Sequence, residues 1–117
     1  MKTITIEGKE YDLHYGIDFI REMDKRYQID ANGFPFGIGV QSAVIYLSQG
    51  NPVVLEDIIL SATHTLKSAP SKAGIEAWLE EQEDFEPIFQ DFLSALETAP
   101  MTKRQVKTIL TTMDAVE

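Results

Sequence analysis

Two histidines, His14 and His64, are the side chains in this sequence best suited to proton transfer or metal binding. Such chemistry needs partners, because a metal needs several closely spaced ligands and a general base needs a group that orients it. The sequence holds no cysteine and no third histidine, and the two histidines fall in different predicted elements. We therefore interpret both as polar surface residues or hydrogen-bonded core residues.

A second group with chemical potential is a cluster of carboxylates at the boundary between two predicted helices: Glu80, Glu81, Glu83, Asp84 and Glu86. Paired carboxylates catalyse reactions when a buried one with a raised pKa lies beside an ionised one. These five surround a helix start, where negative charge is favoured, and we interpret them as a solvated acidic face. The segment NGFPFGIG (32–39) lacks the pattern of a phosphate-binding loop. We predict no catalytic residue, no metal site and no cofactor.

Phe34 and Phe36 flank Pro35 in that glycine-containing segment. The segment from Gln28 to Gly37 is predicted to be a loop, because it contains an Asn-Gly pair and a proline. Two phenylalanines in a loop either tuck into the core or form an exposed anchor for a partner protein. From the sequence we favour the core, and the exposed anchor stays open as the alternative.

The composition points to a globular protein of the cytoplasm. The 117 residues suit one domain, 1–117, with 44% hydrophobic and 25% charged residues. Nineteen acidic and ten basic residues give a net charge of −9, which repels phosphate backbones and anionic lipid. The alternating start of the chain is unlike a signal peptide, and no apolar run is long enough to span a bilayer. We therefore predict neither nucleic-acid nor membrane binding.

Hydrophobic periodicity predicts a mainly α (α+β) fold, in which an N-terminal β-hairpin packs on a bundle of about five to six helices. Two alternating runs around Gly8-Lys9 predict the hairpin. Asn51-Pro52 and Ser71 are typical helix starts. The predicted bounds are about 2–15 for the hairpin and about 16–27, 37–49, 52–66, 72–82, 85–98 and 103–113 for the helices.

Charge is distributed unevenly along the second half of the chain. Eight acidic residues and no basic one lie from Glu76 to Glu97, and the next predicted helix carries Lys103, Arg104 and Lys107 on its polar side. Within one molecule this asymmetry is explained by attraction between neighbouring helices, and between molecules it would suit head-to-tail association. The sequence leaves both readings open.

Several segments resemble a known family, the tail assembly chaperones of long-tailed phages of Gram-positive hosts. The resemblance is carried by TITIEGKEYDLHYGIDFIREMDKRY (3–27), YLSQGNPVVLEDIILSAT (46–63), PSKAGIEAWLEE (70–81), FEPIFQDFLSAL (85–96) and APMTKRQVK (99–107). These segments span nearly the whole chain, which looks like the short form of such proteins. They are patterns of core and turn residues, and the family has no catalytic residues to transfer.

The resemblance implies a non-enzymatic chaperone in the cytoplasm of the infected host, absent from the mature virion. Such proteins bind the tape measure protein, keep it soluble and promote assembly of the tail tube around it, so the tail tube protein is a further implied partner. Members also tend to self-associate. The candidate protein-binding surface comprises Phe34, Phe36, Phe85, Phe89, Phe92, Lys103, Arg104 and Lys107.

Two other functions compete with the chaperone. A host adaptor or regulatory domain would dock one partner as an acidic helical module and stay monomeric. A small hydrolase would use the carboxylate cluster, and replacing Glu80, Glu81 and Glu83 with glutamine would abolish its turnover. The sequence does not specify the oligomeric state, the bound segment of the client or the existence of a longer frameshifted form.

Overall fold

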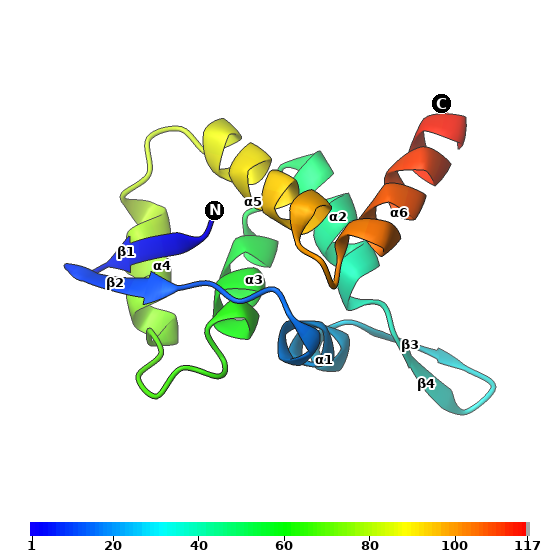
Figure 1. The fold of residues 1–117 in the computed structure, drawn as a ribbon, viewed down its shortest axis with the longest axis horizontal. Coiled ribbons are helices and arrows are strands. Elements are labelled where there is room, and N and C mark those ends of the chain that lie inside the picture. Colours follow the sequence, from blue (N-terminus) through cyan, green and yellow to red (C-terminus); the bar gives the residue numbers. More distant parts are fainter. Residues whose placement is uncertain (117) are drawn as a thin grey trace.

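The computed structural model describes residues 1–116, which form six helices and two antiparallel β-hairpins (Figure 1). The mainly helical α+β prediction is confirmed, and the second hairpin was not predicted. The strands are β1 (Thr3–Ile6), β2 (Lys9–Asp12), β3 (Gln28–Ala31) and β4 (Phe34–Gly37). The helices are α1 (Ile17–Arg26), α2 (Gly39–Gln49), α3 (Val53–Ala62), α4 (Lys72–Glu80), α5 (Glu86–Thr98) and α6 (Lys103–Val116).

The first hairpin pairs β1 with β2 and lies beside α4 (Figure 1). Its turn is Glu7-Gly8, one residue earlier than predicted, and both residues have positive φ angles of 52° and 78°. Two left-handed residues match the right-handed twist of the flanking strands. Ile4 and Ile6 point into the core and are almost fully buried, so this hairpin is stabilised by the helices beneath it.

The core lies between α1, α2 and α3, and α5 and α6 cover the remaining side of α2. As predicted, Ser71 caps α4, and its side chain accepts a hydrogen bond from the Gly74 N–H. Helix α3 begins at Val53, one residue later than predicted, with Pro52 in the N-cap position, and the Asn51 side chain accepts a hydrogen bond from the Val53 N–H. Helix α3 ends at Ala62, earlier than the predicted residue 66. The hydroxyl of the next residue, Thr63, donates to the Ile59 carbonyl and occupies an acceptor at the end of the helix.

The second hairpin replaces the loop predicted from Gln28 to Gly37. Strands β3 and β4 are joined by Asn32-Gly33, whose φ angles of 54° and 83° are both positive. This is the backbone of the two-residue turn that an Asn-Gly pair favours between strands. Figure 1 shows the hairpin projecting away from the helices at the end of the molecule that also carries α6.

The base of this hairpin is held firmly between α1 and α2. The Ile38 N–H donates to the Tyr27 carbonyl at 2.8 Å, and the Gly39 N–H donates to Asp24 Oδ1 at 2.8 Å. Gly39 allows the close approach, because a Cβ at this position would lie 2.5 Å from the Met23 backbone. The hairpin therefore projects from a rigid support.

A buried hydroxyl connects the last two helices. The Thr102 side chain is fully buried, and its Oγ1 donates to the Leu96 carbonyl at 2.7 Å. This bond occupies a carbonyl in the last turn of α5 and fixes the start of α6 against it. Along the described chain no helix is both long and apolar enough to cross a membrane.

Candidate protein-binding surfaces

The β3–β4 hairpin has one face made only of apolar side chains. The register places Ile29 opposite Phe36 and Ala31 opposite Phe34, so these four residues lie on the same face, which we call the hairpin face. Phe34 is 68% exposed, Phe36 54% and Ile29 51%. Because none of them packs into the core cluster, the hairpin face is open to solvent.

The exposure of Phe34 and Phe36 corrects the prediction that they belong to the core. Both lie on a hairpin that contacts the body mainly through β4 and α1, so no element of the described chain covers its outer part. A two-stranded hairpin is marginal in water, and a continuous exposed apolar patch typically marks an interaction site. The alternative of an exposed anchor is the one that fits the structure.

Ile29 belongs to this surface but sequence reasoning did not select it. The signal was present, since an Asn-Gly pair flanked by alternating apolar residues is a strong hairpin pattern. Applying that pattern would have placed Ile29 on the same face as the two phenylalanines. Because the segment was predicted to be a loop, the alternation of side chains along a strand was not used to group Ile29 with Phe34 and Phe36.

The α5 stripe does not provide the predicted contact surface. Phe89 and Phe92 are 6% and 0% exposed, and they are core residues because α5 packs its apolar side on α2 and α6. Phe85 is half-buried, with its ring centroid 6.0 Å from that of Phe89. An apolar stripe at helical spacing is in this case the inner face of a helix.

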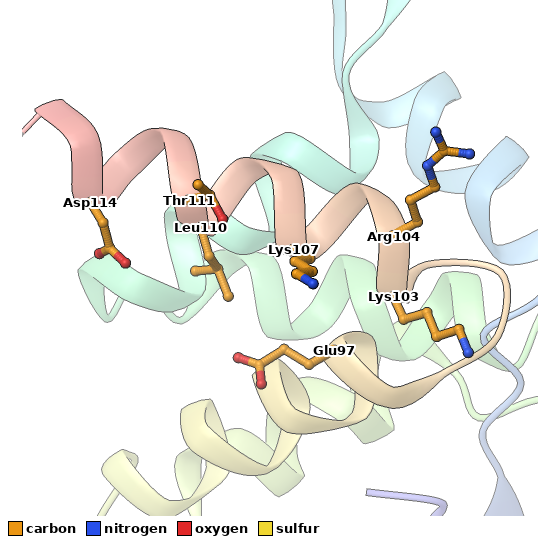
Figure 2. A pocket seen from close by; sticks show the side chains of 7 residues that line it. All are labelled: Glu97, Lys103, Arg104, Lys107, Leu110, Thr111 and Asp114. Carbon is orange, nitrogen blue, oxygen red and sulfur yellow. The ribbon is translucent and has the colours of Figure 1, made fainter.

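Lys103, Arg104 and Lys107 lie together on the exposed side of α6. They line an open cleft of about 550 Å³ with Leu110 and Thr111, and two carboxylates, Asp114 of α6 and Glu97 of α5, belong to the same lining (Figure 2). We call this the basic cleft. Within residues 1–116 the three cationic side chains form no ion pair, since every salt bridge found there joins other residues.

The carboxylate cluster at the α4–α5 junction is exposed to solvent at all five positions. Asp84 Oδ1 accepts a hydrogen bond from the Glu86 N–H at 3.1 Å, close to the start of α5. Asp84 therefore helps to satisfy the backbone N–H groups at the start of α5. An acid–base pair would need a buried carboxylate with a raised pKa, and all five carboxylates are exposed. In the part of the chain that the structure describes, no group of three or more His, Asp and Glu side chains is placed to hold a metal ion.

The two histidines lie on the surface, apart from each other. His14 is exposed, and its backbone N–H donates to the Ala62 carbonyl. His64 Nε2 lies 3.4 Å from Glu22 Oε1. A hydrogen bond from Lys25 holds the pKa of the Glu22 carboxyl below its usual value, and Arg26 and His64 lower it further.

Tyr27 stiffens the support of the hairpin. Burial raises the pKa of its hydroxyl, and a hydrogen bond to Asp57 Oδ2 acts in the same direction. The bond joins the residue before β3 to helix α3, and the Tyr27 ring meets the Tyr46 ring edge to face at 5.7 Å. The hairpin face is therefore presented from a fixed position.

Comparison with known proteins gives one family. A family model described as phage tail assembly chaperone protein matches residues 3–111, which include both hairpins and the three cations of the basic cleft. No curated protein and no solved structure matches the chain.

Proposed function

We infer the function from one premise, which is that the chain belongs to the phage tail assembly chaperone family. We propose that it binds the tape measure protein in the host cytoplasm, keeps it soluble and promotes assembly of the tail tube around it. In this proposal the tail tube protein is a second partner, the chaperone is non-enzymatic and self-associating, and it leaves before the virion matures.

The observation that carries this proposal is the open hairpin face. A chaperone for a long, aggregation-prone client needs exposed apolar side chains that contact the client directly. Ile29, Phe34 and Phe36 supply such side chains on a support fixed at both ends. Helices of a client present apolar stripes at i, i+3, i+4 and i+7, which fit a flat apolar face of this kind.

The net charge of −9 supports the same function. A protein that exposes apolar side chains risks aggregating with itself, and strong like charge keeps separate copies in solution. Membership of the family favours the chaperone function over the host adaptor function. A host adaptor would be a monomer that binds one partner tightly.

The test is co-expression with the tape measure protein of the same phage. We expect the wild-type chaperone to raise the soluble yield of the client and to elute with it. The double variant Phe34→Ser/Phe36→Ser should lose most of this effect, because it removes the two largest side chains of the hairpin face. Val53→Ser is the matched control, since Val53 is 65% exposed and lies on α3.

Two results would contradict the proposal. One is a soluble yield of the client that does not depend on the chaperone, together with no complex on gel filtration. The other is a loss of client binding in the Val53→Ser control equal to the loss in the double variant, because binding would then not depend on the hairpin face.

A further inference from the structure

Strand β3 has a free edge, which lies on the side away from β4. In an antiparallel pair, residues that exchange hydrogen bonds alternate with residues whose backbone groups point away from the partner strand. The Ile38 N–H donates to the Tyr27 carbonyl, so this pair is a bonded one. Continuing the register from it, Gln28 and Asp30 direct their N–H and C=O groups away from β4. Both residues are exposed, and within residues 1–116 neither N–H donates a hydrogen bond to another element.

The outer edge of β4, by contrast, is closed to a further strand. Pro35 lies opposite Asp30, at an outward-facing position, and has no N–H to donate. Gly37 is the other outward-facing residue, and it lies so close to α1 that a Cβ there would overlap the Asp24 side chain. Proline on an edge strand is one of the ways in which proteins prevent pairing with another chain. The hairpin can therefore accept a further strand only at β3.

The first hairpin protects its outer edge with charge. The same alternation makes Glu10 and Asp12 of β2 the residues with outward-facing backbone groups. Three of the four residues of β2 are charged, and charged side chains on an edge strand oppose the addition of another strand. Residues 28–37 contain one charged residue, Asp30, and β3 itself contains no proline. Of the two hairpins, the second has the edge that is open to pairing.

We propose that the edge of β3 binds an extended segment of a partner protein, which joins the hairpin as a third strand. The segment alternates apolar and basic side chains. Its apolar side chains lie beside Ile29 and Ala31 and continue the hairpin face. Its basic side chains lie on the opposite face with Asp30, and the net charge of −9 attracts them. The main-chain hydrogen bonds supply affinity, and the alternation supplies specificity.

This contact goes beyond the proposed function, because it concerns the backbone edge of the hairpin and does not depend on which protein supplies the segment. A helix that packs on the hairpin face leaves the outward N–H groups of Gln28 and Asp30 in water. An added strand binds them, so the two modes of recognition differ at these two amides. The modes are compatible, since a third strand widens the apolar face on which a helix can pack. A two-stranded hairpin also gains stability from a third strand.

The experiment measures amide hydrogen exchange of the wild-type protein by NMR with two synthetic peptides of identical composition. One peptide alternates isoleucine with lysine and threonine. The control peptide contains the same residues in an order that spaces the isoleucines at i, i+3 and i+4, as in a helix. At saturation the alternating peptide should slow exchange of the Gln28 and Asp30 N–H groups by about tenfold or more. The control peptide should leave both rates unchanged.

Two proline variants test the backbone contact. Asp30→Pro removes an outward N–H without breaking a hydrogen bond between β3 and β4, and it should abolish the slowing of exchange at Gln28. Glu10→Pro is the matched control, because it removes an outward N–H and a negative charge from β2, and it should behave as the wild type does. Asp30→Asn keeps the N–H and should retain the slowing at Gln28, with weaker binding of the basic peptide. Urea unfolding checks that each variant is folded, and the wild-type measurement decides the proposal if Asp30→Pro is not.

Four results would overturn the proposal. One is exchange at Gln28 and Asp30 that stays unchanged at the highest soluble concentration of the alternating peptide. Another is equal slowing by both peptides, because charge and composition would then explain binding. A third is a folded Asp30→Pro variant that still shows the full effect at Gln28. The last is slow exchange at both amides in the protein alone that increases with its concentration, which would assign the edge to a second copy. Co-expression with the tape measure protein is a separate test, so either proposal can fail without the other.

Discussion

Replacing Phe34 and Phe36 with serine separates the contribution of the hairpin face to binding from any contribution to folding. A phenylalanine side chain can bury about 150–250 Å². With 68% and 54% of these residues exposed, the pair offers roughly 250 Å² to a partner. At about 25 cal/mol per Å² this area is worth about 6 kcal/mol as an upper limit.

Binding recovers only part of that value, because ordering of side chains and loss of motion oppose association. We expect the double variant to lose about 2–3 kcal/mol of binding free energy for the tape measure protein, a rise in Kd of about 30- to 150-fold. The free energy of unfolding should change by less than about 1 kcal/mol, because both side chains face solvent in the free protein.

The assay pairs calorimetric titration of a purified client segment with urea unfolding. Trp78 is the single tryptophan and is half-buried on α4, so its fluorescence reports unfolding without a label. The reasoning would be refuted if the Kd stayed the same while the free energy of unfolding fell by more than about 2 kcal/mol. That result would show that the two phenylalanines stabilise the fold and do not contact the client.

Three further predictions concern stability, each measured by urea unfolding. Gly39→Ala places a Cβ 2.5 Å from the backbone of α1 and should cost about 1–3 kcal/mol or more, whereas Gly16→Ala, with open space around it, should change little. Thr102→Val leaves a buried carbonyl of α5 without its donor and should cost about 1–2 kcal/mol, against almost nothing for the exposed Thr108→Val. Glu22 has a folded-state pKa below its ordinary value of 4.5, so its ionised form stabilises the protein above that pH. The advantage of the wild type over Glu22→Gln should therefore be full near neutral pH and disappear as the pH falls through the folded pKa.

Helix starts that carry a clear capping signal were predictable from the sequence. Asn51-Pro52 and Ser71 identified the starts of α3 and α4, because a side-chain oxygen and a fixed φ angle act within one turn of the chain. Helix ends were less predictable. The predicted end of α3 at residue 66 follows the apolar spacing, whereas the helix ends at Ala62, where the Thr63 hydroxyl bonds back to Ile59.

The candidate surface was predictable only in part, because amphipathicity does not say which way a stripe faces. Phe34 and Phe89 both belong to apolar patterns, but one points to solvent and the other into the core. The difference comes from tertiary placement: α5 has α2 and α6 to cover it, and the outer part of the β3–β4 hairpin has no such neighbour in the described chain. No local propensity encodes that contrast.

The hydrogen bond from Ile38 to the Tyr27 carbonyl joins the two residues that flank the β3–β4 hairpin. Helices α1 and α2 are thus already brought together beneath it, and residues 28–37 form an insertion that the body does not need for its own packing. Mutations of the exposed residues on the hairpin face can alter recognition while the body stays folded. In the proposed function, selection can therefore change the client while the scaffold stays constant.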